Sequence, residues 1–174
     1  MSEQKILITN IKLNKDDTAH IEFKKSDDLG SGVTKWDGQE KITSEFKDAF
    51  LNCKEGFLGC IPELKEKNVT MNNMFFYYNK ESNKLDKALY SIKYAFNPAN
   101  NAVINVSTPQ LPIYKDGFDE KTFCISGKHE IALYKVIELA EKYMEGETRT
   151  EQQKCVKQDA DGNIVVDFTG KKEE

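Results

Sequence analysis

The chain has 174 residues, of which 39% are hydrophobic and 31% charged, and its formal net charge at pH 7 is −4. This composition is typical of a folded globular protein and does not fit an intrinsically disordered chain. Because the charge is negative and Arg149 is the only arginine, a strong general affinity for phosphate backbones is also disfavoured.

The first forty residues predict a β-hairpin followed by a loop. Two alternating runs, residues 5–13 and 18–25, flank a polar turn at residues 14–17. In the second run Ala19, Ile21 and Phe23 share one face, which leaves His20 on the other face, toward solvent. Residues 26–39 lose the alternation and predict a loop or a short irregular hairpin around Trp36. Trp36 could anchor a partner or pack over the edge of the core, and the large area of its ring favours packing.

A helix is predicted from about Ser44, with Thr43 or Ser44 as its N-cap. Its apolar stripe should face the sheet and consists of Phe46, Ala49, Phe50 and Cys53. Gly56 and Gly59 are expected to end this helix. The apolar residues that follow, up to Leu64, could form another short helical turn.

Residues 69–106 predict three consecutive antiparallel strands that are rich in aromatic residues, joined by turns at residues 79–84 and 97–101. Together with Trp36, five residues of this meander are candidate contacts for a partner: Phe76, Tyr78, Tyr90, Tyr94 and Lys93. Aromatic side chains beside lysines can hold single-stranded nucleic acid through base stacking. Aromatic residues on strands are also commonly buried, and we favour burial in the core as the interpretation.

The last third of the chain predicts a loop, a long helix and a hairpin. Residues 111–125 are irregular, with one weak strand at 122–125. The helix spans residues 126–145, and its apolar face consists of Leu133, Val136, Ile137, Ala140 and Met144. Residues 155–168 predict a β-hairpin around the turn at 159–163. This turn is a poor calcium loop, because its glycine comes too early and no acidic residue stands at the twelfth position.

Together these elements predict an α+β fold, in which an antiparallel sheet of about five to seven strands has two helices packed on one face. Residues 1–146 should form a single domain. Residues 147–174 should form a linker and a C-terminal β-hairpin, which is either an arm or an edge of the sheet because two isolated strands are only marginally stable.

The sequence contains no motif for a catalytic, metal or cofactor site. Glycine-rich phosphate loops, H-E-x-x-H and G-x-S-x-G are all absent, and the only histidines are His20 and His129. We therefore predict no catalytic residues, no metal and no cofactor. The four cysteines form no C-x-x-C pair and predict reduced thiols. No apolar run reaches the length of a membrane span and no signal peptide is evident, so we expect a cytoplasmic protein without a membrane partner.

The order of the predicted elements also resembles that of a group of known proteins. The first strand, its partner His20-Ile-Glu-Phe23, the Ser44–Phe50 helix and the meander resemble, over residues 5–145, small uncharacterised proteins of bacteriophages and prophages of low-GC bacteria. The resemblance implies a non-catalytic protein that binds a host or phage macromolecule, for example as an inhibitor of host defence. The leading hypothesis is binding of another protein. The alternatives are single-stranded nucleic-acid binding in phage replication or recombination, and an enzyme of unrecognised class.

Overall fold

The computed structural model describes residues 6–25, 32–97, 102–115 and 123–146, and the backbone of residues 155–158 and 164–167. The main sheet has seven strands in the order β3-β2-β1-β4-β5-β6, and β7 pairs with β5 on its own; all of these pairs are antiparallel. The strands are β1 (Ile6–Leu13), β2 (Ala19–Lys25), β3 (Thr34–Asp37), β4 (Val69–Tyr78), β5 (Leu85–Asn97), β6 (Ala102–Ser107) and β7 (Leu111–Pro112).

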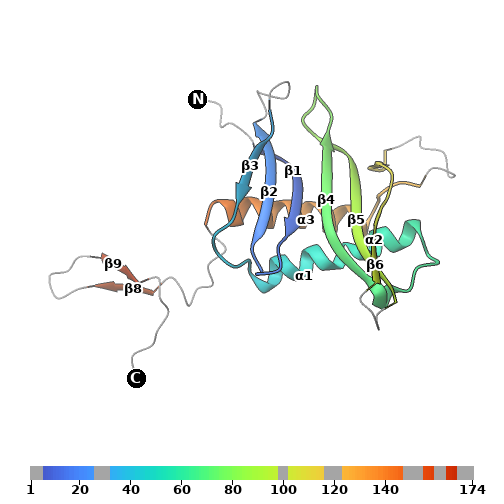
Figure 1. The fold of residues 1–174 in the computed structure, drawn as a ribbon. Helices are drawn as coiled ribbons and strands as arrows, with labels where there is room; N and C mark the ends of the chain where they lie inside the picture. Colours follow the sequence, from blue (N-terminus) through green and yellow to red (C-terminus); the bar gives the residue numbers. More distant parts are fainter. Residues whose placement is uncertain are drawn as a thin grey trace.

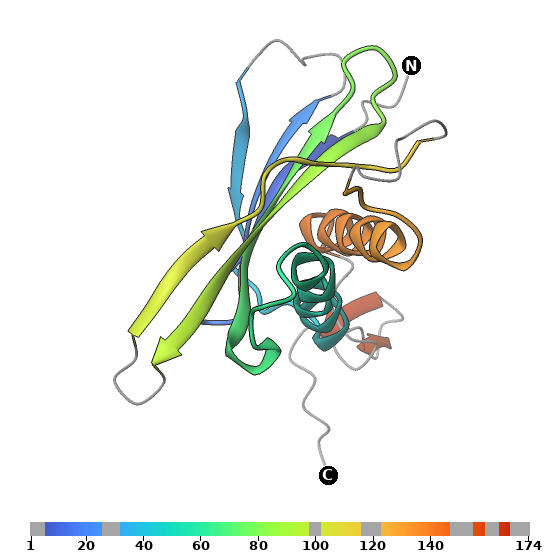
Figure 2. The ribbon, with the colours of Figure 1, turned by 90° about the vertical axis from the view of Figure 1, so that its right-hand side faces the viewer.

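All helices of the main domain lie on one face of this sheet, as Figure 2 shows from the side. They are α1 (Ser44–Asn52), α2 (Lys54–Cys60), the short 3-10 helix η1 (Glu66–Asn68) and α3 (Lys128–Met144). Both layers are visible in Figure 1, where α1 and α3 run behind the strands. The predicted α+β fold, an antiparallel sheet with helices packed on one face, is confirmed.

The core lies between the sheet and the helices. It contains the predicted stripe of α1 through Phe46 and Phe50, and the predicted stripe of α3 through Leu133, Val136 and Ala140, all fully buried. Thr43 caps α1, because its hydroxyl accepts a hydrogen bond from the backbone N–H of Phe46 at 3.2 Å. The faces of both helices that the 3.6-residue periodicity predicted to pack against the sheet are therefore confirmed.

The expected end of the first helix at its glycines is wrong. α1 ends at Asn52, and α2 continues through Gly56 and Gly59 to Cys60. The reason is a close contact with the sheet, because a Cβ atom at Gly56 would lie 2.9 Å from the hydroxyl of Tyr90. Gly56 therefore serves packing of α2 against β5 rather than termination of a helix.

The C-terminal hairpin forms a sheet of its own. β8 (Cys155–Gln158) and β9 (Ile164–Asp167) pair with each other and with no other described strand. The predicted linker at 147–154 and the predicted turn at 159–163 lie outside the described residues, as do residues 98–101 of the turn between β5 and β6. None of the described helices combines the length and hydropathy needed to cross a membrane.

Two cysteines of the α1–α2 region should resist alkylation in the native protein. Burial raises the pKa of Cys53 to about 12 and that of Cys60 to about 11, from an ordinary value near 9. At pH 8.5 we expect iodoacetamide to label Cys53 at least about tenfold more slowly in buffer than in urea, because the reactive species is the exposed thiolate. Mass spectrometry of the alkylated peptides measures the labelling rate in buffer and in urea.

The same raised pKa values give a pH dependence to stability. Both thiols are neutral in the folded state over a wider pH range than in the unfolded state. Their contribution to the free energy of unfolding is therefore complete below pH 9 and is lost as pH rises through 11 to 12.

In urea without reductant all four cysteines of the chain should be labelled. A pair that stayed protected there would reveal a disulfide and contradict the prediction of reduced thiols.

Candidate functional site

The aromatic candidates of the meander separate into buried and accessible residues. Phe76, only 2% exposed, and Tyr90 lie in the core beneath the helices. Neither offers surface to a partner, so both are removed from the candidate site. Tyr78 and Tyr94 are half-buried and pack against the same core, whereas Lys93 is exposed on the opposite face of β5.

Trp36 packs over the edge of the core. It lies on β3 opposite Ile21 of β2, and its ring meets the ring of Tyr143 edge to face, with centroids 5.1 Å apart. The hydroxyl of Tyr143 donates a hydrogen bond to the backbone carbonyl of Glu40. A Cβ atom at Gly38 would lie 2.7 Å from ring carbons of Tyr143, so only glycine fits there. These contacts tie the edge strand β3 to α3 through Trp36, which is half-buried.

One edge of the sheet carries most of the accessible apolar surface on the strands. Its large exposed side chains are Phe96 on β5, 58% exposed, and Val103 and Ile104 on β6, 55% and 49% exposed. Tyr94 lies directly opposite Ile104 in the β5–β6 register. We call these four residues the apolar edge. Figure 2 shows that the ends of β5 and β6 run past the helices. Phe96, Val103 and Ile104 are exposed there, whereas Tyr94 is half-buried.

The two edges of the sheet differ in how they are protected from other strands. β3 has only four residues and includes Lys35 and Asp37, charges that discourage pairing with a foreign strand. β6 has six residues, Ala-Val-Ile-Asn-Val-Ser, none of them charged and none of them proline. No strand in the described part of the chain pairs with the outer edge of β6. This edge is therefore open to a further strand.

The face of the sheet away from the helices holds a groove. Pairing between β1 and β4 is confined to residues 10–12 of β1 and 73–75 of β4, and the strands diverge beyond it (Figure 1). The groove opens beside this divergence and has a volume of about 310 Å³. We call it the open-face groove; its lining includes Leu7, Glu22, Lys24, Phe75, Tyr77 and Lys80. The core residue Phe76 and its neighbour Tyr78 also border it.

The β-sheet register explains which side chains reach this groove. Ile11 pairs with Ile21 of β2 and with Met74 of β4, and all three are in the core. The preceding residue Asn10 pairs with Glu22 and Phe75, which consequently point to the opposite, open face. On β4, the side chains of Phe75 and Tyr77, rather than those of their neighbours Phe76 and Tyr78, are therefore directed to the open face.

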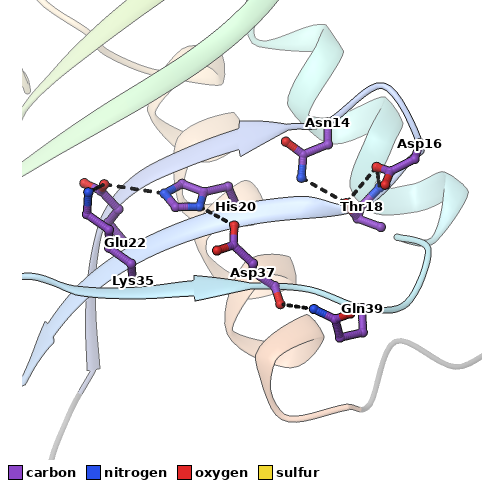
Figure 3. Close-up of polar contacts among 8 residues, drawn as sticks. All are labelled: Asn14, Asp16, Thr18, His20, Glu22, Lys35, Asp37 and Gln39. Atoms are coloured by element: carbon purple, nitrogen blue, oxygen red, sulfur yellow. Dashed lines mark hydrogen bonds and ion pairs between the residues drawn. The ribbon is translucent and has the colours of Figure 1, made fainter.

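A polar network borders the groove on β2 and β3. Figure 3 shows it in front of the strands, with the helices behind. His20 lies between two carboxylates, with Nδ1 2.5 Å from Asp37 Oδ1 and Nε2 3.4 Å from Glu22 Oε1. The ammonium of Lys35 is 3.6 Å from the same oxygen of Glu22. Since each ring nitrogen of His20 faces a carboxylate oxygen, neither is placed to take a proton from a substrate.

The β1 strand also contains two buried polar atoms that lack a hydrogen-bond partner among the described residues, Thr9 Oγ1 and Asn10 Oδ1. They lie at the irregularity in the β1–β2 register between Ile8 and Asn10. Unpaired buried polar atoms each cost about 1–3 kcal/mol. Asn10 is also one of the three β1 residues that pair with β4, and Thr9 lines the open-face groove.

Comparison of the chain with protein-family models, with curated proteins and with solved structures found no match. Within the described residues, no three His, Cys, Asp or Glu side chains gather closely enough to hold a metal ion. The apolar edge and the open-face groove are therefore assigned from their own residues. For the apolar edge, the uncharged run at residues 102–107 was the signal that the sequence offered.

Proposed function

We propose that this chain is a non-catalytic binding protein and that its partner is another protein, bound at the apolar edge. The observation that carries the proposal is the combination of three exposed large apolar side chains, Phe96, Val103 and Ile104, with an uncharged edge strand. Protein partners commonly add a strand to such an edge: backbone hydrogen bonds supply affinity, and pockets for alternate side chains supply specificity. Val103 and Ile104 are consecutive on β6 and point to opposite faces, so they flank the open backbone edge, and a partner bound there would remove them from water.

Single-stranded nucleic acid fits this edge less well than protein does. β6 carries no lysine or arginine, and affinity for nucleic acid depends on positive charges that neutralise phosphates. The resemblance to phage and prophage proteins suggests where such a partner would be found. In that setting the partner is a host or phage protein, and a component of a host defence system is one such target.

The proposal is tested by placing a charge on the edge. Ile104→Lys should weaken partner binding by at least about tenfold, or ~1.4 kcal/mol, because a lysine in the interface must be desolvated without a counter-charge. Tagged protein is incubated with a nuclease-treated lysate of a low-GC bacterium, and retained proteins are identified by mass spectrometry. Ile131→Lys is the matched control, because Ile131 is 70% exposed on α3, away from the edge.

The expected result is a protein that survives nuclease treatment, is lost with Ile104→Lys and is kept with Ile131→Lys. Sedimentation of the purified chain shows whether that protein is a second copy of the chain itself. Loss of all retained material after nuclease treatment would point to nucleic acid and contradict the proposal. Equal retention by both lysine variants would show that the partner binds elsewhere.

A further inference from the structure

The open-face groove has a positive charge balance, although the whole chain is acidic. Its one acidic lining residue, Glu22, is already paired with Lys35 and with His20. Lys24 and Lys80, which also line the groove, make no ion pair with any described residue. Two lysines against one carboxylate give the lining a net positive charge, which favours an anion in the groove.

The open-face groove is also lined by two aromatic side chains. Phe75 and Tyr77 alternate along β4 on the open face, both half-buried, so each ring keeps some accessible surface. Leu7 of β1 also lines the groove but is only 1% exposed, so the two aromatic rings supply the apolar contact. Aromatic side chains of this kind stack against planar ligands, and base-aromatic stacking is tolerant of which ring is bound.

We propose that the open-face groove binds a small ligand in which a planar ring is joined to a phosphate, the chemistry of a nucleoside monophosphate. Phe75 and Tyr77 contact the ring, and Lys24 and Lys80 contact the phosphate as point charges. The volume of about 310 Å³ is at the lower end of the range for small-molecule pockets, which suits one such unit rather than a longer chain. The groove and the apolar edge are separate surfaces, so this inference stands or falls independently of the proposed protein partner.

Titration calorimetry with the full chain tests the inference, using adenosine monophosphate and uridine monophosphate as probes. Both should bind saturably at low salt. Adenosine lacks the phosphate and inorganic phosphate lacks the planar ring, so each should bind at least about tenfold more weakly than the monophosphates. The double variant Lys24→Gln/Lys80→Gln should lose about tenfold or more in affinity for the monophosphates, and Phe75→Ala a similar factor.

The control is Lys93→Gln, because Lys93 is an exposed lysine on the same face of the sheet that does not line the groove. It should bind the monophosphates as the wild type does, and melting temperatures show that each variant is folded. Three results would overturn the inference. These are no saturable binding of either monophosphate, unchanged affinity in the double lysine variant, or affinity for single-stranded oligonucleotides that greatly exceeds that for monophosphates and grows with length.

Discussion

Phe76→Ala should lower the free energy of unfolding by about 3–5 kcal/mol. The side chain is 2% exposed and belongs to the core cluster between the sheet and the helices. Truncation removes its apolar area from the core and leaves a cavity that the surrounding strands and helices can only partly fill. A urea titration followed by circular dichroism measures the loss.

Phe75→Ala is the matched control for this substitution. Phe75 is the preceding residue on the same strand, has the same side chain, and points to the open face, where it is only half-buried. Its truncation should cost clearly less, about 1–2 kcal/mol, because less area returns to water and no enclosed cavity forms. Equal losses for the two variants would mean that both faces of β4 are covered, contrary to the arrangement in Figure 2.

Local periodicity explains how much of this fold could be predicted from the sequence. Strands β1, β2, β4 and β5 are short runs rich in apolar, β-branched or aromatic residues, and the stripes of α1 and α3 follow the helical period. Each of these elements could therefore be placed from its own residues. β3 was expected as a loop or irregular hairpin because it has four residues with a single apolar side chain, Trp36. Its strand conformation depends on pairing with β2, a contact that no local pattern encodes.

The candidate surfaces were harder to predict, because alternation does not say which face of a strand is covered. Phe75 and Phe76 are equivalent in the sequence, and only the position of the helices makes Phe76 a core residue and leaves Phe75 half-buried on the open face. The same holds for Ile104, predicted on an apolar face and observed at 49% exposure because β6 extends past the helices. Whether helices cover a strand face depends on the tertiary structure. It can be predicted only when the lengths of the sheet and of the helical layer are both known.

The second large effect is expected at Tyr143, where three parts of the chain meet. Its ring contacts Trp36 of β3 at 5.1 Å and Phe46 of α1 at 5.9 Å between centroids, and its hydroxyl donates to the carbonyl of Glu40. Burial raises the pKa of this hydroxyl, so it remains protonated and a donor at neutral pH. Tyr143→Ala should therefore cost about 3–5 kcal/mol, since it opens a cavity and also removes the contacts that hold β3.

Tyr143→Phe separates the two contributions. It keeps the ring contacts and removes only the hydroxyl, so it should cost about 0.5–1.5 kcal/mol, the usual net value of one hydrogen bond. Tyr134→Ala, at an exposed position of the same helix, controls for loss of a tyrosine from α3 and should cost less than either cavity-forming change. Because Trp36 is the only tryptophan, its fluorescence reports directly on the packing of β3. The emission maximum should shift to longer wavelength in Tyr143→Ala and stay unchanged in Tyr143→Phe. An unshifted maximum in the alanine variant would show that β3 is held by its pairing with β2 and not by Tyr143.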